Sequence, residues 1–138
     1  VENYEATDIP ERIFFINNTV AGNTYGLTGG DNIVVLNNIF ANTIETALKD
    51  TDGNSIAAYN LFRNNGVNVD GAEWMEETCL FANPFLNAEF GLLALSSCID
   101  AGIPASEWNN ETLLSRTDFE SSDSDHDLGA FEYEAVAD

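Results

Sequence analysis

The sequence is poor in basic residues. Of its 138 residues, 4 are Lys or Arg and 24 are Asp or Glu, which gives a formal net charge of −20 at pH 7. A protein with this charge is repelled by the phosphates of nucleic acids and by anionic membrane surfaces. We therefore expect neither nucleic acid nor acidic lipid among its partners.

Long apolar runs are also missing from the sequence. The longest, Ile13 to Ile16, Ile33 to Leu36 and Phe90 to Leu95, are much shorter than the roughly 18 residues of a membrane-spanning helix, so we expect no membrane insertion. A hydrophobic share of 44% is nevertheless too high for a disordered acidic tail. The length fits one folded domain. Val1 is not an initiator Met, and the sequence that follows it does not have the pattern of a signal peptide. We therefore expect a mature chain or a piece of a longer protein.

Asparagine, in contrast, is abundant, and it marks an internal repeat. The chain has 17 Asn residues, several of them in adjacent pairs. Three segments align column by column without a gap, with a period of 20 and then 22 residues: residues 13–23, 33–43 and 55–65.

The aligned columns have the pattern of strands joined by a corner. Apolar residues alternate, as side chains on a strand do, in three columns: Phe14, Val34 and Ile56; Ile16, Leu36 and Ala58; Val20, Phe40 and Phe62. One Asn stands at the same place in all three copies, at Asn18, Asn38 and Asn60. Asn tolerates the left-handed conformation of a tight corner, and its amide both donates and accepts hydrogen bonds.

These features predict an all-β fold, a right-handed parallel β-helix solenoid of about four to five coils. Coils about 4.8 Å apart would place Asn18, Asn38 and Asn60 directly above one another, as a ladder of stacked amides. The alternative is that these residues mark ordinary surface turns, which β-sandwiches also contain.

The repeat predicts how the single domain, residues 1–138, is organised. We expect residues 1–11 to form an N-terminal edge or cap, residues 12–102 the coils, and residues 103–138 a C-terminal cap, because the periodicity ends near Pro104. A divergent fourth coil would start near Cys79, and a fifth, partial coil would include Leu92 to Ile99.

The C-terminal half contains motifs that resemble a known group of proteins. They are Asn83-Pro-Phe-Leu-Asn87, Gly91-Leu-Leu-Ala-Leu-Ser-Ser-Cys-Ile-Asp-Ala-Gly102 and Asp127-Leu-Gly-Ala-Phe-Glu-Tyr133. In this order they resemble the C-terminal signature of secreted bacterial right-handed parallel β-helix repeat proteins of the pectate-lyase-like superfamily. The resemblance implies a bacterial protein that is extracellular or at the cell surface. Members with known activity are often polysaccharide lyases or glycoside hydrolases.

For a lyase of this kind, the resemblance draws attention to Lys49 and Arg63. A polyuronate lyase needs a basic residue to abstract a proton and cations beside the substrate carboxylate. A surface with a net charge of −20 repels a polyanion, however. The simpler interpretation is that Lys49 belongs to a solvated turn and that Arg63 points outward from a strand.

A second candidate site contains Trp74, Glu73, Glu76 and Glu77. Two carboxylates about 5 to 9 Å apart can act as acid and base in glycoside hydrolysis, and an exposed Trp beside carboxylates is typical of a sugar-binding cleft. We predict substrate binding here. The alternative is a Trp packed on the wall of the solenoid.

The segment Asp123-Ser-Asp-His-Asp127 predicts a Ca²⁺ site. Asp123, Asp125 and Asp127 offer alternating oxygen ligands before a Gly, although no bidentate Glu follows as in known calcium loops. Asp127 also belongs to the closing motif, which gives it a competing structural role. Zinc is not expected, because His126 is the single His and has no Cys or second His nearby in the sequence.

The two cysteines leave their redox state open. Cys79 and Cys98 are 19 residues apart, about one coil, so stacking could bring them together as a disulfide. Two buried thiols in neighbouring coils fit the sequence equally well.

The function predicted from these observations is that of a structural or carbohydrate-contacting β-helix segment, with polysaccharide as the partner and no active site located. The alternative is a polysaccharide lyase or glycoside hydrolase whose catalytic residues lie partly outside this chain. A short solenoid also leaves an open strand edge near Val1 to Glu11, through which we expect self-association.

Overall fold

The structure is a computed structural model that describes residues 13–29, 32–51, 53–103, 105–108, 111–115 and 126–133. The edge or cap expected at residues 1–11 lies outside the described residues, and self-association through it stays a prediction. Much of the cap expected at residues 103–138 lies outside them as well. The described part consists mainly of short strands and loops, with one 3-10 helix, η1 (Glu76–Thr78).

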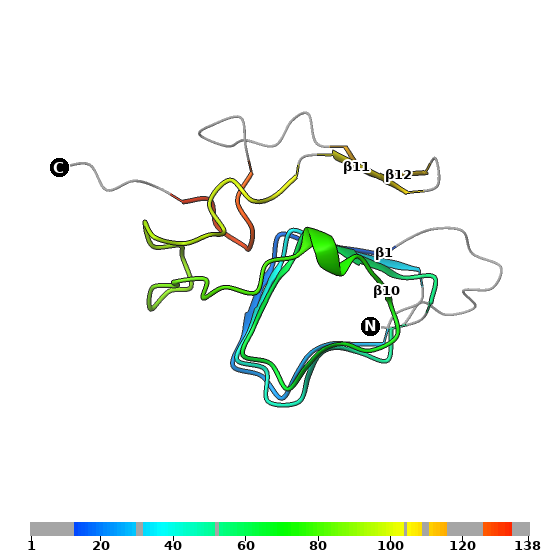
Figure 1. The fold of residues 1–138 in the computed structure, drawn as a ribbon, viewed down its shortest axis with the longest axis horizontal. Helices are drawn as coiled ribbons and strands as arrows, with labels where there is room; N and C mark the ends of the chain where they lie inside the picture. The colour runs from blue at the N-terminus through cyan, green and yellow to red at the C-terminus, as the bar shows by residue number, and fades with distance from the viewer. Residues whose placement is uncertain are drawn as a thin grey trace.

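Successive strands repeat in groups of three, and each group follows one coil of the chain. The first coil contains β1 to β3, the second β4 to β6 and the third β7 to β9, and β10 begins a fourth (Figure 1). The bounds are β1 Ile13–Ile16, β2 Thr19–Ala21, β3 Tyr25–Thr28, β4 Ile33–Leu36, β5 Ile39–Ala41, β6 Thr46–Lys49, β7 Ile56–Ala58, β8 Leu61–Arg63, β9 Val67–Val69 and β10 Glu73–Trp74.

Each strand pairs in parallel with the corresponding strand of the next coil, so the coils stack into three parallel sheets. The sheet orders are β1-β4-β7-β10, β2-β5-β8 and β3-β6-β9. Ile13 pairs with Ile33, and Val34 pairs with Ile56, which are the offsets of the sequence repeat. The repeat alignment and the all-β prediction are therefore confirmed, and the arrangement is compatible with a parallel β-helix.

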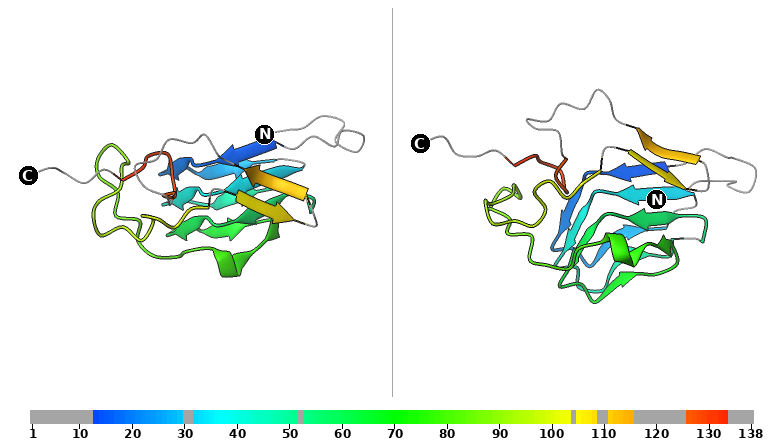
Figure 2. Two further views of the ribbon diagram at one scale, coloured as in Figure 1. Left: turned by 90° about the horizontal axis from the view of Figure 1, so that it is seen from above. Right: turned by 45° about the horizontal axis from the view of Figure 1, so that its top comes forward.

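The number of coils is smaller than the four to five expected. β10 pairs with β7, and Leu80 forms an isolated parallel bridge with Leu61. Beyond Leu80, the described residues add no strand to the three parallel sheets, so the stack has three complete coils and a partial fourth. The segment 84–102 runs along the side of the stack instead (Figure 2), because Leu92 and Cys98 pack against the outer face of the β2-β5-β8 sheet.

The expected ladder of amides is present at the first corner of the coils. Asn18 Nδ2 donates to Asn38 Oδ1 at 3.1 Å, and Asn38 Nδ2 donates to Asn60 Oδ1 at 3.0 Å. The backbone N–H groups of Asn18 and Asn38 donate to the same two oxygens, at 2.7 and 2.9 Å. These contacts place the three side chains one above another, so the stacking prediction is confirmed.

The left-handed residue of this corner is not the ladder Asn, as the sequence suggested, but the residue before it. The backbone φ angles there are 57°, 59° and 55°, at Asn17, Asn37 and Tyr59. The ladder position therefore selects Asn for its amide, and the preceding position selects residues that tolerate a positive φ.

Aromatic rings stack along the axis inside the coils. The ring centroids of Phe40 and Phe62 are 5.4 Å apart, with 9° between the ring planes, and Phe15 lies 6.2 Å from Phe40. Phe40 and Phe62 occupy equivalent positions of successive coils, so one inward column of the repeat supplies most of this stack. Such ring contacts add to the burial of apolar area that stabilises the core.

The outer face of the β1-β4-β7-β10 sheet is covered. Residues that alternate with the inward ones form a buried cluster on this face: Val34, Leu36, Ile56 and Ala58. Figures 1 and 2 show the antiparallel hairpin of β11 (Ala105–Trp108) and β12 (Glu111–Ser115) beyond this face.

The outer face of the β2-β5-β8 sheet holds the C-terminal segment. Asn17 Nδ2 donates to the carbonyl oxygens of Asp127 and Gly129, at 3.0 and 3.2 Å. Asn37 Nδ2 donates to the carbonyl oxygen of Ile103 at 2.7 Å, and its Oδ1 accepts from the N–H of Ile103 at 3.0 Å. The two members of an Asn pair thus have different tasks. The second builds the ladder, and the first fastens the C-terminal segment to the stack.

Candidate functional site

The outer face of the β3-β6-β9 sheet differs from the other two, because no segment among the described residues covers it. In Figure 1, no described segment lies beyond this side of the coil. Tyr25, Thr46 and Val67 pair in one row across the sheet. Tyr25 is 37% exposed and Val67 is 51% exposed. Tyr25, at the start of β3, and Val67, at the start of β9, therefore present an aromatic ring and an aliphatic side chain to solvent.

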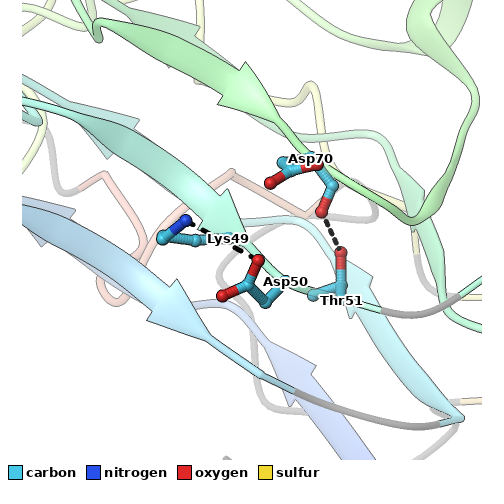
Figure 3. A network of polar contacts seen from close by, with 4 residues as sticks. All are labelled: Lys49, Asp50, Thr51 and Asp70. Carbon is cyan, nitrogen blue, oxygen red and sulfur yellow. Dashed lines mark hydrogen bonds and ion pairs between the residues drawn. The ribbon is translucent and has the colours of Figure 1, made fainter.

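Tyr25 belongs to a polar cluster at this sheet. Lys49 Nζ lies 5.7 Å from the centroid of the Tyr25 ring, within cation–π range, and 3.6 Å from Asp50 Oδ1 (Figure 3). A hydrogen bond to Glu45 raises the pKa of Tyr25 above its ordinary value of 10.0, and desolvation and the charges of Glu45 and Asp50 act in the same direction. The phenol therefore stays neutral at pH 7, where its hydroxyl can still accept a hydrogen bond from a ligand.

Lys49 and Arg63, the residues considered for lyase chemistry, lie on different sheets. Arg63 ends β8, just before the second corner of its coil, whereas Lys49 ends β6, at the far end of the third sheet. The four residues of β6 correspond to about 13 Å of extended chain. Lys49 contacts Asp50 and the Tyr25 ring. Lys49 and Arg63 therefore do not form one cationic site but act as two separate residues.

Trp74 packs into the end of the stack formed by β9 and β10. Its ring lies edge-on to Phe62 and Phe81, with centroids 5.6 and 6.2 Å away, and it contacts the inner core. Its Nε1 is buried without a hydrogen-bond partner among the described residues. The acidic members of the predicted site are exposed beside it: Glu73, Glu76 and Glu77. The ring thus belongs to the wall of the coil, and ligand binding by this group stays a prediction.

Asp127 has the structural role that the closing motif suggested. Its Oδ1 accepts a hydrogen bond from the N–H of Asp100 at 2.7 Å, and its Oδ2 accepts one from the N–H of Tyr133. Asp123 and Asp125 lie outside the described residues, so the Ca²⁺ site stays a prediction. Within the described ranges, no group of three His, Cys, Asp or Glu side chains is arranged to hold a metal ion.

Both cysteines are free thiols in different environments. Cys79 packs against the core inside the coils, and Cys98 is buried on the outer side of the β2-β5-β8 sheet. The structure thus has no disulfide between them, but Cys79 is only partly buried and Cys98 does not lie in a neighbouring coil, so neither alternative is met in full. Burial raises the pKa of Cys98 to about 11, so its thiol is uncharged at neutral pH.

A groove at the second corner was not found from the sequence. Asn42 and Asn64 stand one above the other there, both with positive φ, and Asn64 Nδ2 donates to Asn42 Oδ1 at 2.9 Å. A cavity of about 460 Å³ on one side of this pair is lined by Arg63, Pro84 and Leu86. A cavity of about 360 Å³ on the other side is lined by Ile44 and Gly66.

The sequence contained half of the signal for this groove. Asn42 and Asn64 occupy the same column of the aligned repeat, so their stacking could have been predicted. The wall that Asn83, Pro84 and Leu86 supply could not, because the repeat predicted another coil where the chain turns along the side of the stack.

Comparisons with protein-family models, with curated proteins and with solved structures found no match to this chain. Among the described residues, no helix has the length and apolar character needed to cross a membrane.

Proposed function

We propose that this chain is the C-terminal segment of a right-handed parallel β-helix of the pectate-lyase-like superfamily, secreted or displayed on the surface of a bacterial cell. In this proposal it acts as a structural scaffold that contacts carbohydrate. The three C-terminal motifs support the family, and the stacked parallel sheets are compatible with it. The observation that carries the carbohydrate contact is the uncovered face of the β3-β6-β9 sheet around Tyr25.

The side chains on this face have the chemistry that a neutral sugar chain requires. A sugar ring presents C–H groups that pack on an aromatic ring, here that of Tyr25. Its hydroxyls can donate to Glu45 and Asp50 and accept from Lys49. A neutral polysaccharide also avoids the repulsion that a polyanion meets at a net charge of −20.

The same geometry favours a scaffold over a polysaccharide lyase or glycoside hydrolase. Lys49 and Arg63 do not share a sheet, and Lys49 pairs with Asp50. The carboxylates of Glu73, Glu76 and Glu77 are exposed near a Trp that packs inward. Catalysis would thus require residues other than these five.

A glycan array combined with a reducing-sugar assay on the same sample tests this proposal. We expect binding to neutral polysaccharides without release of reducing ends. Tyr25→Ala should weaken the binding at least about tenfold. Phe90→Ala is the control, because Phe90 is an exposed aromatic residue between Leu86 and Leu92, which pack against the β2-β5-β8 sheet. Absence of binding to every glycan would overturn the proposal, and release of reducing ends would favour the enzyme.

A further variant separates the two candidate contact sites. The double substitution Glu76→Gln and Glu77→Gln removes two exposed charges beside Trp74 without touching Tyr25. If this variant loses glycan binding and Tyr25→Ala retains it, the contact lies at the end of the stack, where the sequence predicted it. The opposite result supports the β3-β6-β9 face.

A further inference from the structure

The two hollows at the second corner form one groove. Asn42 and Asn64 line both of them, so the hollows meet across this pair. We call the whole the corner groove. Backbone hydrogen bonds between neighbouring coils fix its floor. Asn42 N–H donates to the carbonyl oxygen of Arg63 at 2.9 Å, and Gly66 N–H donates to the carbonyl oxygen of Thr43 at 3.1 Å. The groove is therefore built on hydrogen-bonded backbone.

One end of the corner groove is cationic. Arg63 is exposed there and forms no ion pair within the part of the chain that the structure describes. This is notable in a chain with 4 basic and 24 acidic residues, where carboxylates are abundant. A guanidinium group that no described carboxylate engages offers paired N–H donors to a carboxylate ligand.

The other end of the corner groove is apolar. Ile44 is 70% exposed beside Gly66, and its backbone N–H is fixed by a hydrogen bond to the carbonyl oxygen of Asn23 at 2.8 Å. An aliphatic side chain held outward in this way can pack against an aliphatic group of a ligand. It offers no hydrogen bond to the hydroxyls of a sugar.

We propose that the corner groove binds an extended peptide segment that has a carboxylate side chain and, two residues further, an aliphatic side chain. Arg63 would bind the carboxylate, and Ile44 would pack against the aliphatic side chain. The amides of Asn42 and Asn64 would form hydrogen bonds with the peptide groups between these two side chains. In an extended segment, residues i and i+2 point to the same side, about 7 Å apart. Ile44 is three residues past Ala41, the residue paired with Arg63, which is at most about 10 Å of chain, so an extended segment of three residues can reach both ends of the groove.

The test is an NMR titration of the whole ¹⁵N-labelled chain with a blocked peptide, acetyl-Ser-Asp-Ser-Leu-Ser-amide. We expect shifts at Asn42, Ile44, Arg63, Asn64 and Gly66 that saturate with a dissociation constant in the range of about 1 mM. Arg63→Gln and the replacement of the peptide Asp by Asn should each weaken binding about tenfold, and the combination should weaken it little further, because both remove the same pair.

Matched controls test the contribution of Ile44 to binding and whether the variants remain folded. Ile44→Ser should weaken binding of this peptide but leave binding of its Leu-to-Ser variant unchanged. Both protein substitutions are at exposed side chains, and unchanged spectra outside the groove show that each variant remains folded. Arg63→Lys should recover only part of the affinity, since Lys lacks the paired donors.

Three results would overturn the proposal. The first is no shift at about 10 mM peptide. The second is binding that does not depend on Arg63. The third is binding of glucuronate with the same Arg63 dependence and no Ile44 dependence, which would make the groove a sugar-acid site. The glycan experiment on Tyr25 concerns another sheet, so either proposal can fail without the other.

Discussion

Asn38 and Asn60 are linked by a hydrogen bond from Nδ2 to Oδ1, 3.0 Å long, and both side chains are fully buried. Asn38 Nδ2 also donates to the carbonyl oxygen of Phe15 at 2.8 Å, and its Oδ1 accepts from the backbone and side chain of Asn18. Every hydrogen-bonding group of this amide is thus used within the stack. A buried polar network of this kind is favourable when all members are satisfied and costly when one is removed.

The first prediction follows from this network. Asn38→Asp keeps the shape of the side chain but replaces both donors by an oxygen that faces the carbonyl oxygen of Phe15 and Oδ1 of Asn60. We expect the free energy of unfolding to fall by about 3 kcal/mol or more, measured by urea denaturation. Asn64→Asp is the control, because Asn64 is exposed and Asp also tolerates its positive φ. Equal losses in the two variants would contradict a special role of the ladder.

The second prediction concerns two buried threonines with opposite hydrogen bonding. Thr43 Oγ1 is buried without a hydrogen-bond partner among the described residues, whereas Thr51 Oγ1 donates to the carbonyl oxygen of Asp70 at 3.0 Å (Figure 3). Thr43→Val removes an unsatisfied hydroxyl and should raise the free energy of unfolding by about 1 kcal/mol. Thr51→Val removes a satisfied one and should lower it by about 1 kcal/mol. The two denaturation midpoints should therefore move in opposite directions, and a shift in the same direction would contradict this account.

The coil was predictable because its repeat obeys a local rule. Inward side chains, corner residues and the ladder Asn recur at a fixed spacing, so an alignment of the sequence with itself gave the register of Ile13 with Ile33 and of Val34 with Ile56. The position of the left-handed residue was missed by one place. Both residues of an adjacent Asn pair tolerate a positive φ, and only the backbone shows which of them adopts it.

The path beyond Leu80 was not predictable from the pattern of apolar residues. Leu92 and Cys98 would fit the inside of a further coil as well as the outside of the β2-β5-β8 sheet, where they pack. The sequence does not distinguish these two kinds of burial. For the same reason Trp74 could be read as a ligand-binding residue, although its ring closes the core beside Phe62.

The third prediction compares two glycines with positive φ. Gly71 has a φ of 107°, and a Cβ atom there would lie 1.7 Å from the carbonyl oxygen of Thr51. Gly22 has a φ of 77°, with nothing within 4 Å of a Cβ atom. Gly22→Ala should therefore cost only the left-handed strain, about 1 kcal/mol, whereas Gly71→Ala must also displace backbone and should cost about 3 kcal/mol or more. Thermal and urea denaturation of both variants check the difference, and similar costs would show that the turn between β9 and β10 relaxes freely.

The fourth prediction is a dependence of stability on alkaline pH that comes from Cys98. Burial is the main cause that raises its pKa from 9.0 to about 11, the charge of Asp127 raises it further, and the hydrogen bond with Ser96 acts against both. Below pH 9 the thiol is protonated in the folded and the unfolded chain, so it adds no pH dependence. Between pH 9 and 11 the unfolded chain loses this proton and the folded chain keeps it. The contribution to the free energy of unfolding therefore falls by up to about 1.4 kcal/mol per pH unit.

The variant Cys98→Ala isolates this contribution from the other groups that titrate in the same range. The free energies of unfolding of the original chain and of the variant, measured by urea denaturation, should differ by a constant amount from pH 7 to 8.5. The difference should then change steadily in favour of the variant up to about pH 11. A difference that stays constant across the whole range would mean that the thiol ionises equally well in both states. Cys98 would then not be enclosed between the C-terminal segment and the sheet.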